Sequence, residues 1–236
     1  KVESLLSHPK LGKDMAFNSI FFSKLLLSNS RKYLKVYLPS YLEEALGIYQ
    51  RFPEYGREKK FRLQEVELYL EGDLQYIETE PERGKEYAGK ALKLARKLCE
   101  DYQEEEAFKL LYRALNFYGN DVDRKNCYKY RYEALDVCKR AYQLTHSDYW
   151  QHMAAVQASF FARDISSMVQ EVQIDTRDEW FSRERQAWDL SFAYFEELSG
   201  KGYPYVDRKY YIGSLIKRSE EEAFKFVSDK AAEYAK

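Results

Sequence analysis

Apolar residues recur at intervals of three and four along almost the whole chain, and strict alternation is rare. This spacing is typical of helices with one apolar face. Residues that interrupt helices are scarce, with 10 glycines and 5 prolines among 236 residues, while 33% of the residues are charged. The combination predicts long helices with solvated outer faces, and therefore an all-α fold rather than a β-sandwich rich in turns.

Glycine, proline and short Asn/Asp/Ser clusters divide this pattern into segments. Between the breaks we predict helices near 13–29, 40–51, 58–78, 82–100, 104–118, 122–144, 148–162, 165–173, 177–198, 205–217 and 219–235. The connections between these segments are short, and short connections favour antiparallel packing of neighbouring helices.

Two segments of the chain align with each other without a gap: FRLQEVELYLEGD at Phe61–Asp73 and FKLLYRALNFYGN at Phe108–Asn120. Each opens with Phe, keeps an apolar stripe, and closes on Gly-Asp or Gly-Asn. Glycine is favoured just past the end of a helix, where the backbone turns left-handed. We therefore expect Gly72 and Gly119 to mark helix ends.

A small residue also recurs in the helix that follows each such segment. Ala91 and Ala134 are 43 residues apart, and Ala45 lies 46 residues before Ala91. A small residue at a fixed point allows two helices to pack closely. Cys127 lies two helical turns before Ala134, and we predict that it too is a packing residue.

A recurring helix pair of about 43 to 47 residues with glycine at its inner turn resembles the tetratricopeptide repeat (TPR), in the long-period form found in bacterial signalling and transcription-regulator proteins. The resemblance rests on Phe108, Leu111 and Leu115 in a first helix, the Gly119-Asn120 turn, and Ala134-Leu135 in a second helix. The chain departs from the family pattern in three ways. Its period exceeds the usual length of about 34 residues, the Leu-Gly pair is missing, and no proline follows the second helix.

The resemblance implies an α-solenoid, in which antiparallel helix pairs form a right-handed superhelix. In this organisation residues 1–57 are N-terminal helices with a partial repeat, 58–173 hold the repeats, and 174–236 are C-terminal helices that continue or cap the array.

The resemblance also implies a concave groove that binds extended peptides or the termini of a partner protein. The residues it places in this groove are Arg62, Tyr69, Lys109, Arg113, Asn116, Trp150 and Gln157. Their cations and amide suit a partner with an acidic or C-terminal carboxylate group. Val66 stands where the family's carboxylate clamp would need a polar residue, which argues against a complete clamp.

The stretch RKNCYKYRY at residues 124–132 is the alternative binding feature of the chain. On a helical projection its cations mix with Glu133 and Asp136, and nearby acids weaken the field that phosphate binding needs. We therefore interpret the stretch as a packed and solvated helix face. A nucleic-acid-binding array remains the alternative hypothesis, with Tyr128 and Tyr132 stacking on bases beside the cations Arg124, Lys125, Lys129 and Arg131.

Motifs for catalysis and for cofactor binding do not occur in the sequence. It contains no HExxH, Walker loop or GxSxG, and its three histidines lack metal-ligand spacing. We therefore predict a non-catalytic binding module without a cofactor or a metal. The formal net charge of −1 also disfavours binding of nucleic acid through the whole surface.

The remaining features concern where such a module works. Cys99, Cys127 and Cys138 fit neither a zinc site nor a CxxC redox pair, so we expect reduced thiols in the cytoplasm. No apolar run approaches the roughly 20 residues of a membrane helix, so no membrane association is expected. The chain begins with Lys, which suggests a scaffold or sensor part of a larger regulatory or effector protein, fused to or complexed with an effector domain.

Overall fold

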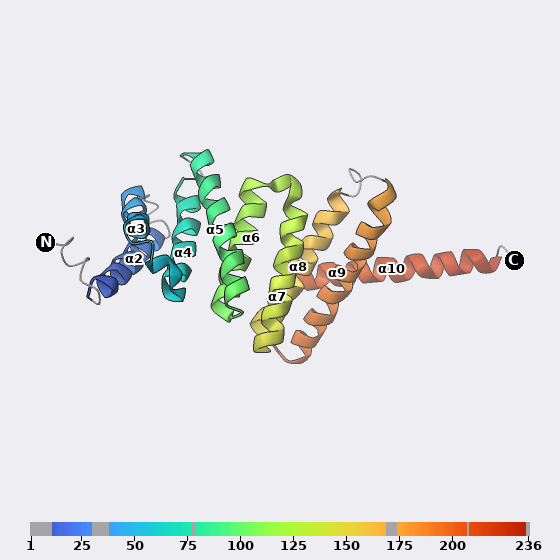
Figure 1. The fold of residues 1–236 in the computed structure, drawn as a ribbon. Coiled ribbons are helices and arrows are strands. Elements are labelled where there is room, and N and C mark those ends of the chain that lie inside the picture. Colours follow the sequence, from blue (N-terminus) through green and yellow to red (C-terminus); the bar gives the residue numbers. More distant parts are fainter. Residues whose placement is uncertain (1–10, 30–37, 77–78, 169–173, 207, 235–236) are drawn as a thin grey trace. The chain divides into compact units, whose positions relative to one another are not determined.

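The computed structural model describes residues 11–29, 38–76, 79–168, 174–206 and 208–234. Every regular element within these ranges is helical, as the apolar spacing predicts, and none is a β-strand. The chain divides into two compact units, Lys1–Arg124 and Lys125–Lys236 (Figure 1). The elements in chain order are α2 (Leu11–Asn29), α3 (Pro39–Arg51), η2 (Tyr55–Arg57), α4 (Lys59–Tyr76), α5 (Pro81–Asp101), α6 (Glu105–Phe117), η3 (Tyr118–Val122), η4 (Arg124–Asn126), α7 (Cys127–Thr145), α8 (Asp148–Met168), α9 (Ile174–Gly200) and α10 (Arg208–Tyr234).

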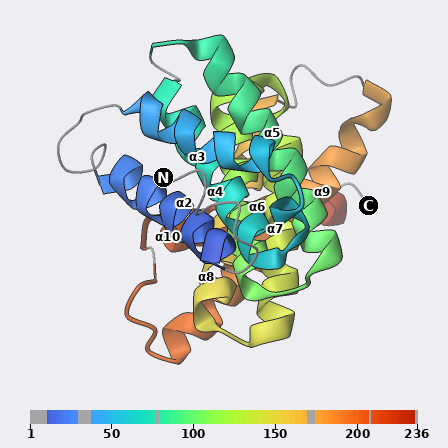
Figure 2. The same ribbon diagram turned by 60° about the vertical axis from the view of Figure 1, so that its left-hand side comes forward.

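Helix α4 is the centre of the first unit and packs on α2, α3, α5 and α6. Figure 2 shows α2 and α3 side by side next to α4. Phe61, at the start of α4, is fully buried. Its ring contacts those of Phe17, Tyr49 and Tyr55, and the Tyr49 hydroxyl donates a 2.8 Å hydrogen bond to the Phe61 carbonyl. The aromatic residue that opens the first repeat segment is therefore a core residue.

Gly72 does not end a helix, contrary to the expectation from the two aligned segments, whereas the helix predicted over 58–78 does run through it. It lies inside α4, is buried, and lacks the left-handed backbone expected past a helix end. A Cβ at this position would lie 2.9 Å from Cδ2 of Tyr87 and 3.1 Å from Cδ2 of Leu42. Glycine is thus required here because α5 and α3 approach the backbone of α4 closely.

The connection from α6 to α7 also differs from the prediction of one helix over 122–144. After Phe117 the chain widens into a π-helical turn, η3, followed by the short 3₁₀ turn η4, and α7 begins only at Cys127. Gly119 lies buried inside η3 without left-handed backbone. The end of α7 agrees with the prediction, since His146 caps it with a positive φ of 50°.

The second unit contains α7 to α10, and α8 packs on both α7 and α9. Trp150, Phe161 and Phe195 are its largest buried side chains. We predicted a break between 162 and 165, but α8 continues to Met168. Ala162 and Ile165 are both buried, and the Ser166 hydroxyl donates to the Ala162 carbonyl, so the helical face persists through the predicted gap.

Helix α10 is likewise continuous where the sequence suggested a break between 217 and 219. Lys217 pairs with Glu220 at 3.1 Å and Arg218 with Glu222 at 3.3 Å, both along the helix. Such pairs at three- and four-residue spacing stabilise a helix across the point where its apolar pattern weakens. The first half of α10 packs on α9 and, less extensively, on α8.

The small residues of the repeated helices are buried as expected for close packing. Ala45 in α3, Ala91 in α5 and Ala134 in α7 are each fully buried. The recurrence in the sequence therefore corresponds to a recurrent packing position.

Candidate functional site

The carboxylate of Glu67 on α4 lies between cations from two other helices. Lys24 of α2 donates a hydrogen bond to its Oε2, and Nη1 of Arg113 on α6 lies 4.0 Å from its Oε1. Because α4 packs on both α2 and α6, the three side chains define one surface. We call it the α2–α4–α6 face, and define it by Lys24, Glu67, Lys109 and Arg113.

The cations of this face outnumber its one central acid. Arg113 is the more exposed of the two cations beside Glu67, with 40% of its side chain accessible against 16% for Lys24. Its 4.0 Å contact is longer than a hydrogen bond, so its N–H donors are not used by Glu67. Lys109 lies one turn before Arg113 on α6 and pairs with Glu105 at 2.9 Å. The guanidinium thus has capacity for a further acceptor.

Phe21 adds an apolar element beside Lys24. Its ring lies 5.2 Å from the Lys24 ammonium and is 38% exposed. Leu25, one turn further along α2, is exposed to the same extent. A chain that binds near Lys24 therefore meets apolar surface as well as positive charge.

The other predicted groove residues of the first unit do not join this face. Arg62 on α4 pairs with Asp101 at 2.6 Å and stacks over Tyr102, so its side chain lies toward the end of α5. Tyr69 packs between Tyr87 and Lys90 of α5, and burial raises the pKa of its hydroxyl. On α4 these two residues lie on the opposite side from Glu67, which the resemblance did not single out.

Asn116 follows Arg113 on α6 but binds its own helix. Its amide nitrogen donates a 2.9 Å hydrogen bond to the Tyr112 carbonyl. Trp150 and Gln157, the two groove residues predicted in the second unit, are buried in α8 with 0% and 1% exposure. Burial leaves them no side-chain surface for a partner, so we do not include them in the candidate site.

The RKNCYKYRY stretch is mostly engaged in packing. Tyr128 makes an edge contact with Trp180, and Tyr132 packs on Phe161 with ring centroids 5.1 Å apart. Arg131 pairs with Asp164 at 3.6 Å and lies over the Phe160 ring. These contacts agree with the packed helix face inferred from the sequence.

The other cations of the stretch differ in their surroundings. Lys125 and Lys129 are exposed in the second unit. Arg124, at the end of the first unit, donates a 2.7 Å hydrogen bond to the Asn120 carbonyl. The exposed side chains of the stretch are therefore those of Arg124, Lys125, Lys129 and Tyr132, of which Tyr132 is 49% exposed.

Cys127 combines packing with a hydrogen bond. Its thiol is half-buried and lies 3.4 Å from Oδ2 of Asp164. Burial and the negative charge of Asp164 raise the pKa of the thiol to about 11. The group therefore keeps its proton at neutral pH and is a weak nucleophile.

Asp73 on α4 is a buried carboxyl group. It is 1% exposed, and its Oδ1 has no hydrogen-bond partner in the described part of the chain. Burial, with a smaller contribution from the charge of Asp121, raises the pKa of Asp73 to about 7. This group changes its charge near neutral pH, although no sequence pattern indicated it.

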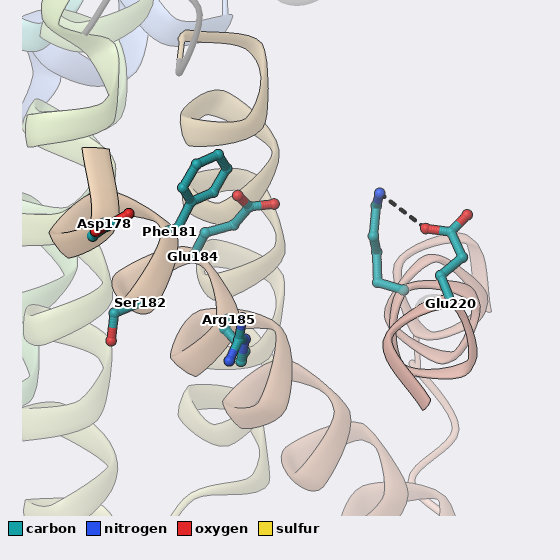
Figure 3. A pocket seen from close by; sticks show the side chains of 7 residues that line it. Asp178, Phe181, Ser182, Glu184, Arg185 and Glu220 are labelled. Carbon is teal, nitrogen blue, oxygen red and sulfur yellow. Dashed lines mark hydrogen bonds and ion pairs between the residues drawn. The ribbon is translucent and has the colours of Figure 1, made fainter. Parts of the chain in front are cut away.

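An open cleft of about 540 Å³ lies between α9 and α10 in the second unit. Figure 3 shows Phe181, Glu184 and Arg185 of α9 on one wall and Glu220 of α10 on the other. A second cleft of about 320 Å³ continues along the same pair of helices, between Phe192 and Leu215. No sequence motif marks this region, but Phe181, Arg185 and Phe192 recur at helical spacing on α9.

Within the described residues no group of three or more His, Cys, Asp and Glu side chains is arranged to hold a metal ion. No helix in the same ranges is both long and apolar enough to cross a membrane. No protein-family model matches this chain, and no match was found among curated proteins or solved structures.

Proposed function

We propose that this protein is a non-catalytic binding module that holds a peptide or partner terminus on the α2–α4–α6 face. The observation that supports it most is the Lys24–Glu67–Arg113 arrangement, in which three helices bring two cations to one acid. The surplus charge and the free donors of Arg113 suit a carboxylate, which guanidinium groups bind through paired hydrogen bonds.

The proposal includes a TPR-like arrangement of helix pairs. In such an array the first helix of each pair lines the concave side. The contacts of α4 with α2 and α6 fit that role for these three helices, with α3 and α5 as second helices. The groove then differs from the one inferred by resemblance, because Glu67 and Lys24 replace Arg62 and Tyr69.

The ligand we propose is an extended segment with a free C-terminal carboxylate or an acidic side chain, followed or preceded by an apolar residue. The carboxylate would bind Arg113 and Lys109, and the apolar residue would lie on Phe21 and Leu25. A ligand with both groups should bind more tightly than one with a carboxylate alone, because the latter would lack the apolar contact with α2.

The test is a selection from a peptide library with free C-terminal carboxylates, run beside the same library with amidated C-termini. We expect enriched peptides only with the free carboxylate or with internal acids, and their loss with Arg113→Ala. Lys97→Ala, at an exposed lysine of α5 that does not belong to the α2–α4–α6 face, is the matched control. Equal enrichment of both libraries by both variants would argue against the proposal.

We do not propose nucleic-acid binding as the function, because Arg131 and the tyrosines of RKNCYKYRY are engaged within the second unit. Binding to single-stranded DNA that weakens steeply with salt, and that is lost with Lys125→Ala and Lys129→Ala together, would reverse this view. We also propose a cytoplasmic role as the scaffold or sensor part of a larger regulatory protein. The three free cysteines are compatible with that location.

A further inference from the structure

Helix α10 carries an exposed apolar stripe that borders its packed face. Ile212, Leu215 and Ile216 are 53%, 40% and 52% exposed. Their spacing of three and four residues places them on one side of the helix, and the exposed Ser219 and Ala223 continue the stripe. The packed face is a different one. There Tyr211 contacts Phe192 and Phe195 of α9, and Ser214 is fully buried.

Charged side chains flank this stripe in a particular order. At 100° per residue, Arg218 and Glu222 lie along one flank and Lys217 and Glu220 along the other. On both flanks the cation precedes the acid in the chain. All four side chains are exposed, from 44% for Lys217 to 70% for Glu222.

We propose that the α10 stripe binds the same stripe of a second copy of this chain, with the two α10 helices antiparallel. A pairing centred on Ser219 brings Leu215 opposite Ala223 of the second copy. It also brings Arg218 within one helical turn of the second copy's Glu222, and Lys217 within one turn of its Glu220. The cation-then-acid order makes each flank complementary to itself when the direction is reversed.

Self-complementarity is the reason for choosing a second copy over another partner. A two-fold interface uses the same patch on both chains, so its charges must match when reversed. Both flanks of α10 meet this requirement. Ser219, at the centre, is small enough for the helices to approach closely.

The cleft beside the stripe adds surface to the same interface. One wall of the 320 Å³ cleft is formed by Leu215, Arg218, Ser219 and Glu222 of α10, and the other wall by Phe192 and Glu196 of α9. Arg218 lies over the Phe192 ring at 4.4 Å. A helix seated on the stripe therefore borders α9 as well as α10, which increases the apolar area that the second copy covers.

The experiment measures self-association of the 236-residue chain by sedimentation equilibrium over a range of micromolar concentrations. The acidic variant carries Lys217→Glu and Arg218→Glu, and the basic variant carries Glu220→Lys and Glu222→Lys. We expect each variant alone to associate more than about tenfold more weakly than the wild type, because like charges then face each other. Mixed in equal amounts, the two variants should associate with each other. Circular dichroism of each variant verifies that it is folded.

The mixture remains informative even if a substitution destabilises α10 itself. Two variants with destabilised helices would not associate when mixed, whereas two folded variants with complementary charges would. A wild-type chain that stays monomeric at all concentrations overturns the proposal. So does a dimer whose strength is the same in the acidic variant, the basic variant and their mixture.

Discussion

The first unit and the α9–α10 region of the second unit use their charges in different ways. In the first unit, some ion pairs run along one helix, as Lys109 with Glu105, but others connect different helices, as Lys24 does with Glu67 and Arg83 with Glu43. On α9 and α10 the pairs run along one helix, as between Arg183 and Glu179 or Arg218 and Glu222. Pairs between helices fix the helices against each other, whereas pairs within a helix stabilise only that helix.

The packing of the two regions follows the same division. Arg83 stacks over Tyr76 and binds Glu43, and both Tyr76 and Tyr87 donate hydrogen bonds to the same carboxylate. This network connects α3, α4 and α5. Between α9 and α10, by contrast, an open cleft separates charged walls. The helices of the first unit are thus held in place by contacts between them, whereas part of α10 is left without a packing partner among the described residues.

The largest effect should come from the aromatic core of the first unit. We expect Phe61→Ala to lower the free energy of unfolding by about 3 to 5 kcal/mol, because it removes a fully buried ring. The matched change is Phe181→Ala in the α9–α10 cleft, where the ring is 41% exposed, and its cost should stay below about 1 kcal/mol. Urea unfolding of both variants tests the contrast, and equal losses would contradict it.

Asp73→Asn should stabilise the protein, but only at higher pH. The pKa of Asp73 is raised to about 7 in the fold and is about 4 in an unfolded chain. Ionisation therefore costs stability as pH rises from about 4, and the full cost is present above about 7. We expect Asn to gain on the order of 2 to 4 kcal/mol at pH 8 and little at pH 4, since one pKa unit corresponds to about 1.4 kcal/mol.

The measurement is the free energy of unfolding against pH for the wild type and Asp73→Asn. Asp14→Asn, at an exposed residue in the first turn of α2, provides the control for loss of a carboxylate. A gain that is the same at pH 4 and pH 8 would show that the pKa of Asp73 does not differ between the folded and the unfolded chain, which would contradict the raised pKa.

Two glycines distinguish close helix contact from open surface. Gly72→Ala places a methyl group 2.9 Å from the Tyr87 ring and should cost about 1 to 3 kcal/mol. Gly47→Ala in α3 meets no atom of the described residues within 4 Å and should gain about 0.5 to 1 kcal/mol, because alanine favours the helix. Thermal melting of the two variants should move in opposite directions. A stabilised Gly72→Ala would mean that α5 does not approach α4 as closely as described.

The smallest effects should separate the two kinds of ion pair. Glu67→Gln removes an acid that binds cations from two helices, and we expect a loss on the order of 1 to 2 kcal/mol. Glu222→Gln breaks an exposed pair within α10 and should cost at most about 0.5 kcal/mol. High salt should reduce the loss of unfolding free energy less for Glu67→Gln than for Glu222→Gln, because the ion pair of Glu67 is partly buried and therefore less screened.

Much of the fold follows from local properties of the sequence. The helical spacing indicates the all-α class, and small residues such as Ala91 and Ala134 mark packed positions. The end of the helix predicted at 144 was also close to the observed end of α7 at Thr145. Continuity of helices was harder to predict. In α10 the apolar pattern weakens near Ser219, but the helix continues because Lys217 and Arg218 form ion pairs with acids one turn later.

Features that depend on contacts distant in sequence could not be predicted in the same way. Gly72 looks like a helix end in sequence, but Tyr87 and Leu42 explain its presence inside α4. Glu67 carries no motif, and its position between two cations arises because Lys24 and Arg113 converge on it from segments 43 and 46 residues away. Resemblance instead singled out Arg62 and Tyr69, which lie toward α5.

The most direct test of the proposed function is the affinity of one selected peptide for three proteins, measured by isothermal titration calorimetry. The proteins are the wild type, Arg113→Ala and the control Lys97→Ala. We predict that Arg113→Ala weakens binding more than about tenfold, since a hydrogen bond to a charged group contributes roughly 1.5 to 3 kcal/mol. We also predict that Lys97→Ala binds like the wild type, and that amidation of the peptide weakens wild-type binding to a similar extent. Unchanged affinity in Arg113→Ala, or binding that is indifferent to amidation of a peptide without other acids, would contradict the assignment of this face.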